Sequence, residues 1–235
     1  MFFDAGEVLV HIPPWRDRLV RALRGLALEV EEERVRGAVA AGQRWLDARP
    51  HQDLLRDYAA EERHAQGHLE VVVRALGVPG VDWRYLRDTC YYIATAQAFA
   101  DAAPAVRAVR ALGLSTGVIS NAPPSLRALL VRLDLAPLFD TITLSSDVGV
   151  MKPGAGVFAL ALERAGVAPD EAAFADDRPE NIDGALSLGF AHGWVVDRDE
   201  HTPDRGDRIR DLSGLPALLA AAGDLGEAAS PATLG

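Results

Sequence analysis

Four short apolar runs of the sequence are each followed by residues that can do chemistry. These residues are Asp4 after the first run, Ser120 and Asn121 after GVI, Lys152 in SSDVGVMKP after FDTITL, and Asp176 with Asp177 at the end of AAFADD. In an open parallel sheet, ligands bind at the carboxyl ends of the strands. If the runs are neighbouring strands, three carboxylates, a hydroxyl, an amide and an ammonium meet at one edge of the sheet.

Three carboxylates at one edge repel one another, and proteins relieve this by protonation or by binding a divalent cation. Oxygen ligands alone favour Mg²⁺, which is commonly held by a few carboxylates together with a substrate phosphate. The nearby Lys152 adds a second positive charge. Such a site can host a carboxylate that attacks phosphorus while Mg²⁺ and Lys152 stabilise the negative charge on the transferred group.

The elements that must position these residues are visible in the second half of the chain. Apolar and β-branched runs over 114–120, 139–144, 172–176 and 193–197 alternate with helical patterns over 123–134, 153–165 and 179–188. This alternation predicts an α/β fold with a mostly parallel sheet between two layers of helices. We therefore expect a Rossmann-like three-layer α/β/α core, which residues 1–4 join as a further strand.

The segment between the first strand and the rest of the core has helical spacing of its apolar residues throughout. We predict four helices over 15–95, which form an all-helical cap. The core domain is then discontinuous and comprises residues 1–14 and 96–224. Residues 225–235 are small and polar, and we expect a flexible tail there.

Composition limits the partners of the 235-residue chain, which carries a formal charge of −10 at pH 7. A negative protein repels nucleic acid and anionic membranes, so we expect a small-molecule ligand and neither of those partners. One cysteine, Cys90, and no signal peptide or apolar span in the sequence lead us to expect a cytoplasmic protein. The sequence does not indicate whether the chain forms an oligomer.

Four segments in order give a specific resemblance. FFDAGEVLV, VISNAP, VGVMKPGAGVF and FADDRPENIDGA resemble the four motifs of haloacid dehalogenase superfamily hydrolases, in subfamily IA, which inserts a helical C1-type cap after the first strand. The resemblance covers nearly the whole chain. It implies a phosphatase-like enzyme in which the motif residues of this chain act on a phosphomonoester.

The resemblance also implies a role for each motif residue. Asp4 would be the nucleophile and form an aspartyl-phosphate, and Ser120 and Lys152 would act beside it in catalysis. Ser120, Asn121 and Gly6 would contact the substrate. The metal ligands for Mg²⁺ would be Asp4, the backbone carbonyl of Gly6, Asp176 and Asp177.

The chain departs from the family pattern at Gly6, where phosphatases of the family usually carry a second aspartate that acts as acid and base. Loss of such a group typically lowers the rate by about 10²–10⁴. Three explanations stay open: Glu7 or His11 replaces the aspartate, the substrate has a good leaving group, or the activity is weak. Two alternatives to a phosphatase follow, namely a metal-independent 2-haloacid dehalogenase and a catalytically weakened binding or regulatory protein. Adjacent Asp176 and Asp177 favour the metal-dependent phosphatase.

Several other patterns receive structural interpretations. Residues 113–117 match the G-x-S-x-G elbow of serine hydrolases, but they precede a strand instead of following one. His64 and His68, with Glu61 nearby, could bind zinc, although a solvated helix face is favoured. The acidic residues 31–33 are expected at the surface. Cys90 is expected to pack in a core. Candidate cap residues for specificity are Trp15, Arg44, Trp45, Arg49 and His51.

The one lysine of the chain carries information of its own. Of its 24 basic residues 23 are arginine, and the exception, Lys152, lies in the third motif. A compact ammonium on a flexible stem fits among carboxylates where a planar guanidinium does not. We therefore predict that Lys152 is an active-site residue that arginine cannot replace.

Overall fold

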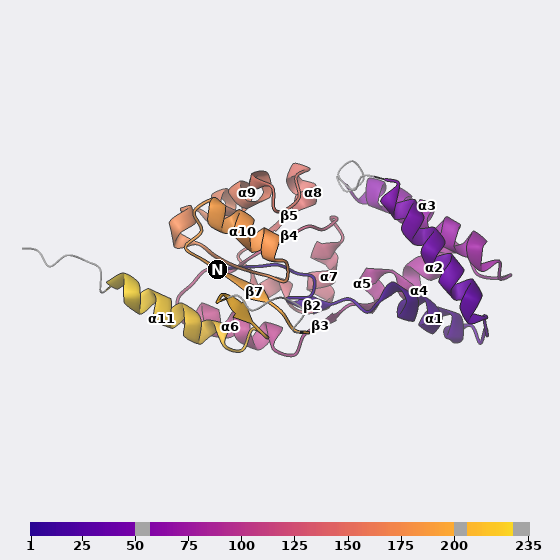
Figure 1. The fold of residues 1–235 in the computed structure, drawn as a ribbon, viewed down its shortest axis with the longest axis horizontal. Coiled ribbons are helices and arrows are strands. Elements are labelled where there is room, and N and C mark those ends of the chain that lie inside the picture. Colours follow the sequence, from indigo (N-terminus) through magenta and orange to yellow (C-terminus); the bar gives the residue numbers. More distant parts are fainter. Residues whose placement is uncertain (50–56, 200–205, 228–235) are drawn as a thin grey trace, which may run out of the picture.

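The computed structural model describes residues 1–49, 57–199 and 206–227, and a six-stranded sheet lies at the centre of its larger part (Figure 1). All pairs of neighbouring strands are parallel, in the order β5-β4-β1-β6-β7-β8. The strands are β1 (Phe2–Phe3), β4 (Gly117–Ser120), β5 (Thr141–Leu144), β6 (Ala173–Asp176), β7 (His192–Val196) and β8 (Arg208–Ile209). The α/β prediction is confirmed, and the first strand of the chain lies at the centre of the sheet.

Helices cover both faces of this sheet because successive strand residues point to opposite sides. Phe3 belongs to a core cluster under α6 (Ala102–Ala111), α7 (Leu126–Arg132) and α11 (Leu215–Glu227). The preceding residue, Phe2, belongs to a second cluster under α9 (Ala155–Ala165) and α10 (Pro179–Ser187). Near-continuous apolar strands are what a parallel sheet buried on both faces requires.

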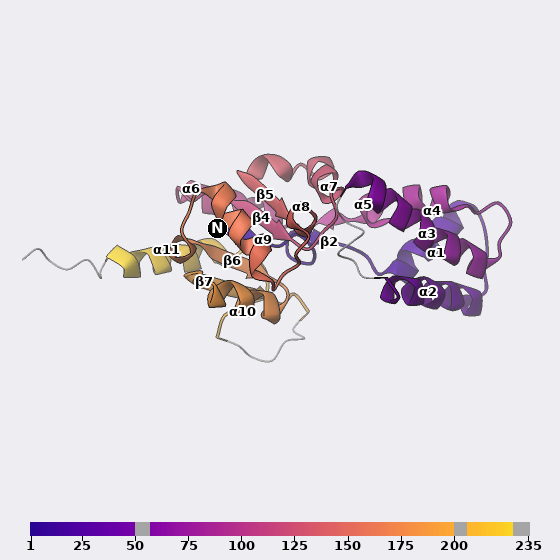
Figure 2. The ribbon, with the colours of Figure 1, turned by 90° about the horizontal axis from the view of Figure 1, so that it is seen from above.

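The segment between β1 and β4 forms a separate helical body, called here the helical insert. It contains α1 (Trp15–Gly25), α2 (Glu32–Asp47), α3 (Tyr58–Leu76), α4 (Trp83–Cys90) and the one-turn α5 (Tyr92–Thr95). Its own apolar core includes Leu19, Leu69 and Cys90, all fully buried. Figures 1 and 2 show the helical insert and the sheet end to end along the longest axis of the molecule.

Two short strands that the sequence did not predict connect the two bodies. β2 (Val10–His11) pairs antiparallel with β3 (Gln97–Ala98), so the chain enters and leaves the helical insert through one ribbon. Two residues per strand are too few to give an alternating pattern, which explains why the sequence does not show them.

Several further elements lie outside the predicted ones, among them the edge strand β8. The short helix α8 (Ser145–Val148) follows β5, and α11 continues to Glu227. The predicted tail from residue 225 is therefore helical for its first three residues, and residues 228–235 lie outside the described part of the chain. Over the described ranges, no helix combines the length and the apolarity that crossing a bilayer requires.

Candidate active site

The ammonium group of Lys152 lies between two aspartates at the carboxyl edge of the sheet. Its Nζ donates hydrogen bonds to Asp4 Oδ1 at 2.7 Å, to Asp176 Oδ2 at 2.6 Å and to the carbonyl oxygen of Ile119 at 2.8 Å. The Lys152 side chain is 1% exposed. Since β1 lies between β4 and β6, the parallel topology brings Asp4 beside Asp176 although 172 residues separate them in sequence. All three donor hydrogens of the ammonium are used.

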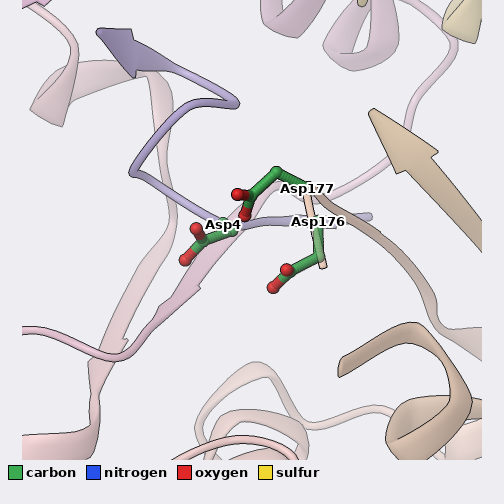
Figure 3. Close-up of side chains that lie close together, drawn as sticks. All are labelled: Asp4, Asp176 and Asp177. Carbon is green, nitrogen blue, oxygen red and sulfur yellow. The ribbon is translucent and has the colours of Figure 1, made fainter. Parts of the chain in front are cut away.

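Asp177 completes a group of three carboxylates (Figure 3). One ligand oxygen from each of Asp4, Asp176 and Asp177 lies within 4.8 Å of the other two. The second oxygen of Asp176 accepts from the backbone N–H of Arg178 and from Asn181 Nδ2, both at 2.9 Å. Protein donors therefore hold both oxygens of Asp176. In contrast, Asp4 Oδ2 and Asp177 accept no hydrogen bond from the described side chains, apart from the contact between Ser120 and the Asp4 carboxylate.

The charges of this site do not balance, because three carboxylates face one ammonium. Burial, and then the neighbouring Asp4 and Asp176, raise the pKa of Asp177 to about 7. Burial also raises the pKa of Asp4, against the opposing effect of Lys152. A divalent cation would supply the missing positive charge, and an all-oxygen donor set suits Mg²⁺. The residues present therefore fit Mg²⁺, which Asp4, Asp177 and Asp176 would hold.

Ser120, the last residue of β4, and Asn121, which follows it, have different positions in the site. Ser120 is buried, lines the same cavity as Asp4 and hydrogen-bonds its carboxylate. The Asn121 side chain pairs with the backbone of Lys152, since Lys152 N donates to Asn121 Oδ1 at 2.6 Å and Asn121 Nδ2 donates to the Lys152 carbonyl at 3.0 Å. Although Asn121 also lines the cavity, both ends of its amide are occupied, so its main structural effect is to position Lys152.

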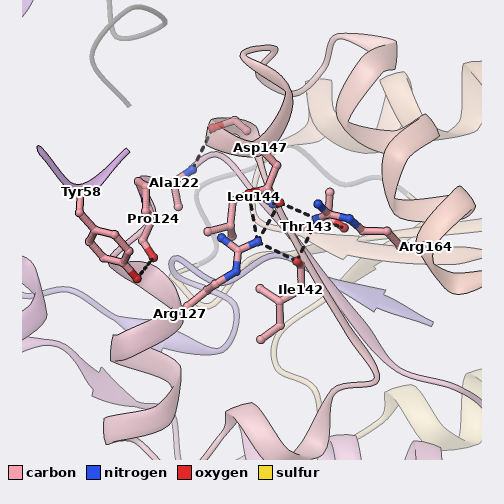
Figure 4. Close-up of polar contacts among 10 residues, drawn as sticks. Tyr58, Ala122, Pro124, Arg127, Ile142, Thr143, Leu144, Asp147 and Arg164 are labelled. Carbon is pink, nitrogen blue, oxygen red and sulfur yellow. Dashed lines mark hydrogen bonds and ion pairs between the residues drawn. The ribbon is translucent and has the colours of Figure 1, made fainter. Parts of the chain in front are cut away.

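Arginine side chains fix the loops that follow β4 and β5 (Figure 4). Arg127 and Arg164 both bind the carboxylate of Asp147, at 2.8 and 2.5 Å, and both also donate to the Ile142 carbonyl. The backbone N–H of Ala122 donates to Ser145 Oγ at 3.2 Å. These contacts connect the segment that follows Ser120 with the segment that leads to Lys152.

The loop after β1 contains Gly6 and Glu7, and His11 lies in β2, which follows this loop. A Cβ at Gly6 would meet only Asp4 Oδ2, at 4.0 Å, so packing does not require glycine there. Glu7 lines the cavity, but one of its carboxylate oxygens accepts from the backbone N–H of Ile12 at 3.0 Å and the other contacts His11 Nδ1 at 3.1 Å. His11 is not among the cavity-lining residues. Of the two candidates for the missing acid, Glu7 is therefore the better placed.

A cavity of about 640 Å³ separates the carboxylates from the helical insert, and Gly6, Asp4 and Asp177 line its sheet side. Its other side carries residues from α1, α2 and α3, including Trp15, Arg18, Leu46 and His68. Of the predicted cap residues that the structure describes, only Trp15 lines the cavity. Trp45 packs on the rings of His64 and His68, Arg44 and Arg49 are exposed elsewhere on the helical insert, and His51 lies outside the described residues.

The prediction of a solvated face for His64 and His68 is wrong. Their exposed fractions are 7% and 6%, and both rings contact the indole of Trp45. The α3 helix packs against α2 on one side and faces the cavity on another. More of its surface is therefore buried than the positions of its aliphatic residues indicated. Glu61 is buried too, but it accepts hydrogen bonds from the backbone N–H and the hydroxyl of Ser125 in place of a metal. Among the described residues, only the three aspartates form a group able to hold an ion.

Other sequence interpretations agree with the geometry. Residues 113–117 join the end of α6 to β4, so the elbow pattern has the reverse of the strand-to-helix context that a serine hydrolase needs. Cys90 is fully buried in the core of the helical insert, and residues 31–33 are exposed.

Comparison with known proteins decides the family. The family model "haloacid dehalogenase-like hydrolase" matches residues 1–189. The chain is also 31% identical over 227 residues to "Phosphatase MT3486" of Mycobacterium tuberculosis, covering 94% of this chain and 96% of that protein. The chain is a haloacid dehalogenase-like hydrolase. Within that family, "Phosphoserine phosphatase" of Thermus thermophilus is 38% identical over 120 residues, which span 50% of this chain and 44% of that protein.

Solved structures show the same fold. The phosphatase of Thermococcus onnurineus superposes with a TM-score of 0.63 at 22% identity and covers 93% of this chain and 96% of its own. The L-2-haloacid dehalogenase of Xanthobacter autotrophicus gives 0.66 at 20% identity, with 93% and 97% covered. Phosphatases and dehalogenases of this family thus share the architecture, and the fold alone does not distinguish the two reactions.

Three residues near the site were not predicted from the sequence. Asn181 holds Asp176 from the first turns of α10, Arg18 lines the cavity from α1, and His68 lines it from α3. The (i, i+4) histidine pair was a visible signal for His68, whereas nothing in the sequence distinguishes Arg18 from the other arginines of α1.

Proposed function

We propose that this hydrolase is a Mg²⁺-dependent phosphatase that cleaves a small phosphorylated metabolite through an aspartyl-phosphate on Asp4. The observation that supports this most directly is the charge pattern at the edge of the sheet. Lys152 neutralises one oxygen each of Asp4 and Asp176, while burial, and then the charges of Asp4 and Asp176, raise the pKa of Asp177 to about 7. A site short of positive charge beside a nucleophilic carboxylate is suited to a cation and a phosphoryl group together.

In the proposed reaction, Asp4 Oδ2 attacks phosphorus because Oδ1 is held by Lys152. A phosphorus–oxygen bond forms to Asp4, and the bond from phosphorus to the ester oxygen breaks. Bound Mg²⁺ would supply Lewis-acid stabilisation of the phosphoryl oxygens. The Ser120 hydroxyl donates a hydrogen bond to the transferred group, and the positive charge of Lys152 stabilises the negative charge that develops on it. Water then attacks phosphorus, which releases phosphate and restores the Asp4 carboxylate.

The leaving oxygen needs a proton, and the chain lacks a carboxylate at position 6. We propose Glu7 as the source, since it lines the cavity in the same loop as Asp4. Substrates with good leaving groups would need this proton least. The proposal includes a cytoplasmic location and no nucleic-acid or membrane partner.

Dehalogenation is a second candidate, because Gly6 provides no second carboxylate and a Pseudomonas putida "(S)-2-haloacid dehalogenase" is 32% identical over 98 residues. That alignment covers 41% of this chain and 43% of that protein. Two adjacent carboxylates at positions 176 and 177 argue against it, because a site that binds no cation would have to bury their charge without compensation.

The test measures phosphate release from p-nitrophenyl phosphate and chloride release from 2-chloropropionate, each with Mg²⁺ and with EDTA. We expect phosphate release only with Mg²⁺, and none from Asp4→Asn. Asp170→Asn, which removes an exposed carboxylate outside the cavity, is the matched control and should behave as wild type. Chloride release in EDTA would identify a dehalogenase instead, and the absence of both activities would favour a binding or regulatory role.

A further inference from the structure

Among the residues that the structure describes, Arg18 is the one cationic side chain on the side of the cavity opposite the aspartates. This residue lies in the second turn of α1, and its Nη1 donates to the Cys90 carbonyl at 3.0 Å. Its guanidinium carbon lies 5.0 Å from the centre of the Trp15 ring. The hydrogen bond and the ring contact fix the guanidinium at the cavity wall, which Arg18 and Trp15 both line.

The charge of Arg18 has no carboxylate partner among the residues that the structure describes. Its Nε is buried and makes no hydrogen bond there, and the same holds for Trp15 Nε1. The guanidinium keeps its proton at any pH at which the protein is folded. A partly buried cation is stable only when an anion or several acceptors compensate for lost hydration.

The Cys90 carbonyl and the Trp15 ring supply only part of that compensation, and no described neighbour of Arg18 adds a negative charge. His68 packs against the Trp15 ring at 5.4 Å, and burial, with contributions from His64 and Arg18, lowers the pKa of His68 to about 4. The imidazole is therefore neutral at pH 7 and adds no negative charge. The aspartates of the site lie on the opposite wall, where Asp4 and Asp176 share Lys152.

We propose that Arg18 binds a carboxylate on the leaving-group side of the phosphomonoester, so that the substrates are phosphorylated carboxylic acids. The planar guanidinium matches the two oxygens of a carboxylate. The phosphoryl group and the carboxylate then occupy opposite walls of one cavity, which keeps the carboxylate away from Asp4 and Asp177. The inference rests on the phosphatase function proposed above.

The experiment uses pairs of esters that differ by one carboxylate. The pairs are 2-phosphoglycolate with ethyl phosphate, O-phosphoserine with O-phosphoethanolamine, and O-phosphotyrosine with tyramine phosphate, which sample three distances between the two groups. For at least one pair, kcat/KM of the wild-type enzyme should favour the carboxylated ester by about 10- to 100-fold, as expected for a hydrogen bond between charged groups. Equal kcat/KM values in all three pairs would overturn the inference while leaving the phosphatase function intact.

Variants then assign the preference to Arg18. Arg18→Gln should bring the ratio of kcat/KM within the favoured pair close to one, and Arg18→Lys should retain part of it. Arg21→Gln, an exposed residue of the same helix that does not line the cavity, is the matched control and should keep the wild-type ratio. Circular dichroism and thermal unfolding confirm that each variant is folded. A ratio that Arg18→Gln leaves unchanged would refute the role of Arg18.

Binding separates the failure of the inference from the failure of the phosphatase function. If the wild-type enzyme hydrolyses none of the six esters, p-nitrophenyl phosphate decides the phosphatase function, and calorimetry of the same pairs with that protein decides the inference. Tighter binding of the carboxylated member, lost in Arg18→Gln and kept in Arg21→Gln, would support a carboxylate site. Equal affinities would overturn it.

Discussion

Replacement of Lys152 by arginine should nearly abolish activity although it keeps the charge. The ammonium makes three hydrogen bonds of 2.6–2.8 Å from one nitrogen in a fully enclosed position. A guanidinium spreads its donors over a plane and has a larger head group, so it cannot reach Asp4, Asp176 and the Ile119 carbonyl from the same point. Misplacing one charge-stabilising donor typically lowers kcat by about 10²–10³-fold. Overpacking this site should also lower the free energy of unfolding by about 1–3 kcal/mol.

The assay is kcat for p-nitrophenyl phosphate with Mg²⁺, read together with urea unfolding. The control is Arg36→Lys, which exchanges the same two residue types at an exposed position of α2. Lys152→Met removes the charge and should lower the free energy of unfolding by about 3–5 kcal/mol, because two buried carboxylates lose their counter-ion. The double variant with Asp176→Asn should recover part of that loss. A folded Lys152→Arg enzyme with a kcat close to wild type would refute the reasoning, since arginine would then serve where the chain has its one lysine.

Four further predictions concern other parts of the molecule. Gly6→Asp should raise kcat for alkyl phosphates, whose leaving oxygen needs a proton, by up to about 10²-fold, and should change p-nitrophenyl phosphate turnover little. Because burial raises the pKa of the Cys90 thiol to about 12, Ellman's reagent at pH 8 should label it only after denaturation, and rapid labelling of the native protein would contradict this burial. The folded-state pKa of His68 lies below its unfolded value of about 6.5. His68 therefore lowers the free energy of unfolding as pH falls from 6.5 towards 4, by up to about 3 kcal/mol. In urea titrations at acid pH, His68→Asn should unfold less readily than the wild type. Glu61→Ala should lower the free energy of unfolding by about 1–3 kcal/mol, because it leaves the buried donors of Ser125 unpaired. The control is Glu62→Ala, which removes an exposed ion pair and should lower the free energy of unfolding by less than about 1 kcal/mol in the same titrations.

Strong local patterns made much of the fold readable from the sequence. The strands at 117–120, 141–144, 173–176 and 192–196 lie inside or within one residue of the predicted runs, because strands buried on both faces are nearly continuous apolar segments. The ribbon of β2 and β3 was not visible, since each strand has only two residues. The burial of His64 was missed for another reason. A polar ring on a helix looks solvent-facing until the neighbouring helix and the cavity wall are known.

The sequence by itself determined which residues reach the edge of the sheet. Each lies just after an apolar run, and parallel strands must end at one edge, so Asp4, Ser120, Lys152 and Asp176 could be named together. Their pairing was decided only by the tertiary structure. The order β4-β1-β6 places Asp4 and Asp176 on either side of one ammonium, leaves Asp177 without a counter-charge and sets Arg18 on the opposite wall of the cavity. These contacts join residues that lie 24 to 148 positions apart in the chain, and local spacing in a sequence carries no information about them.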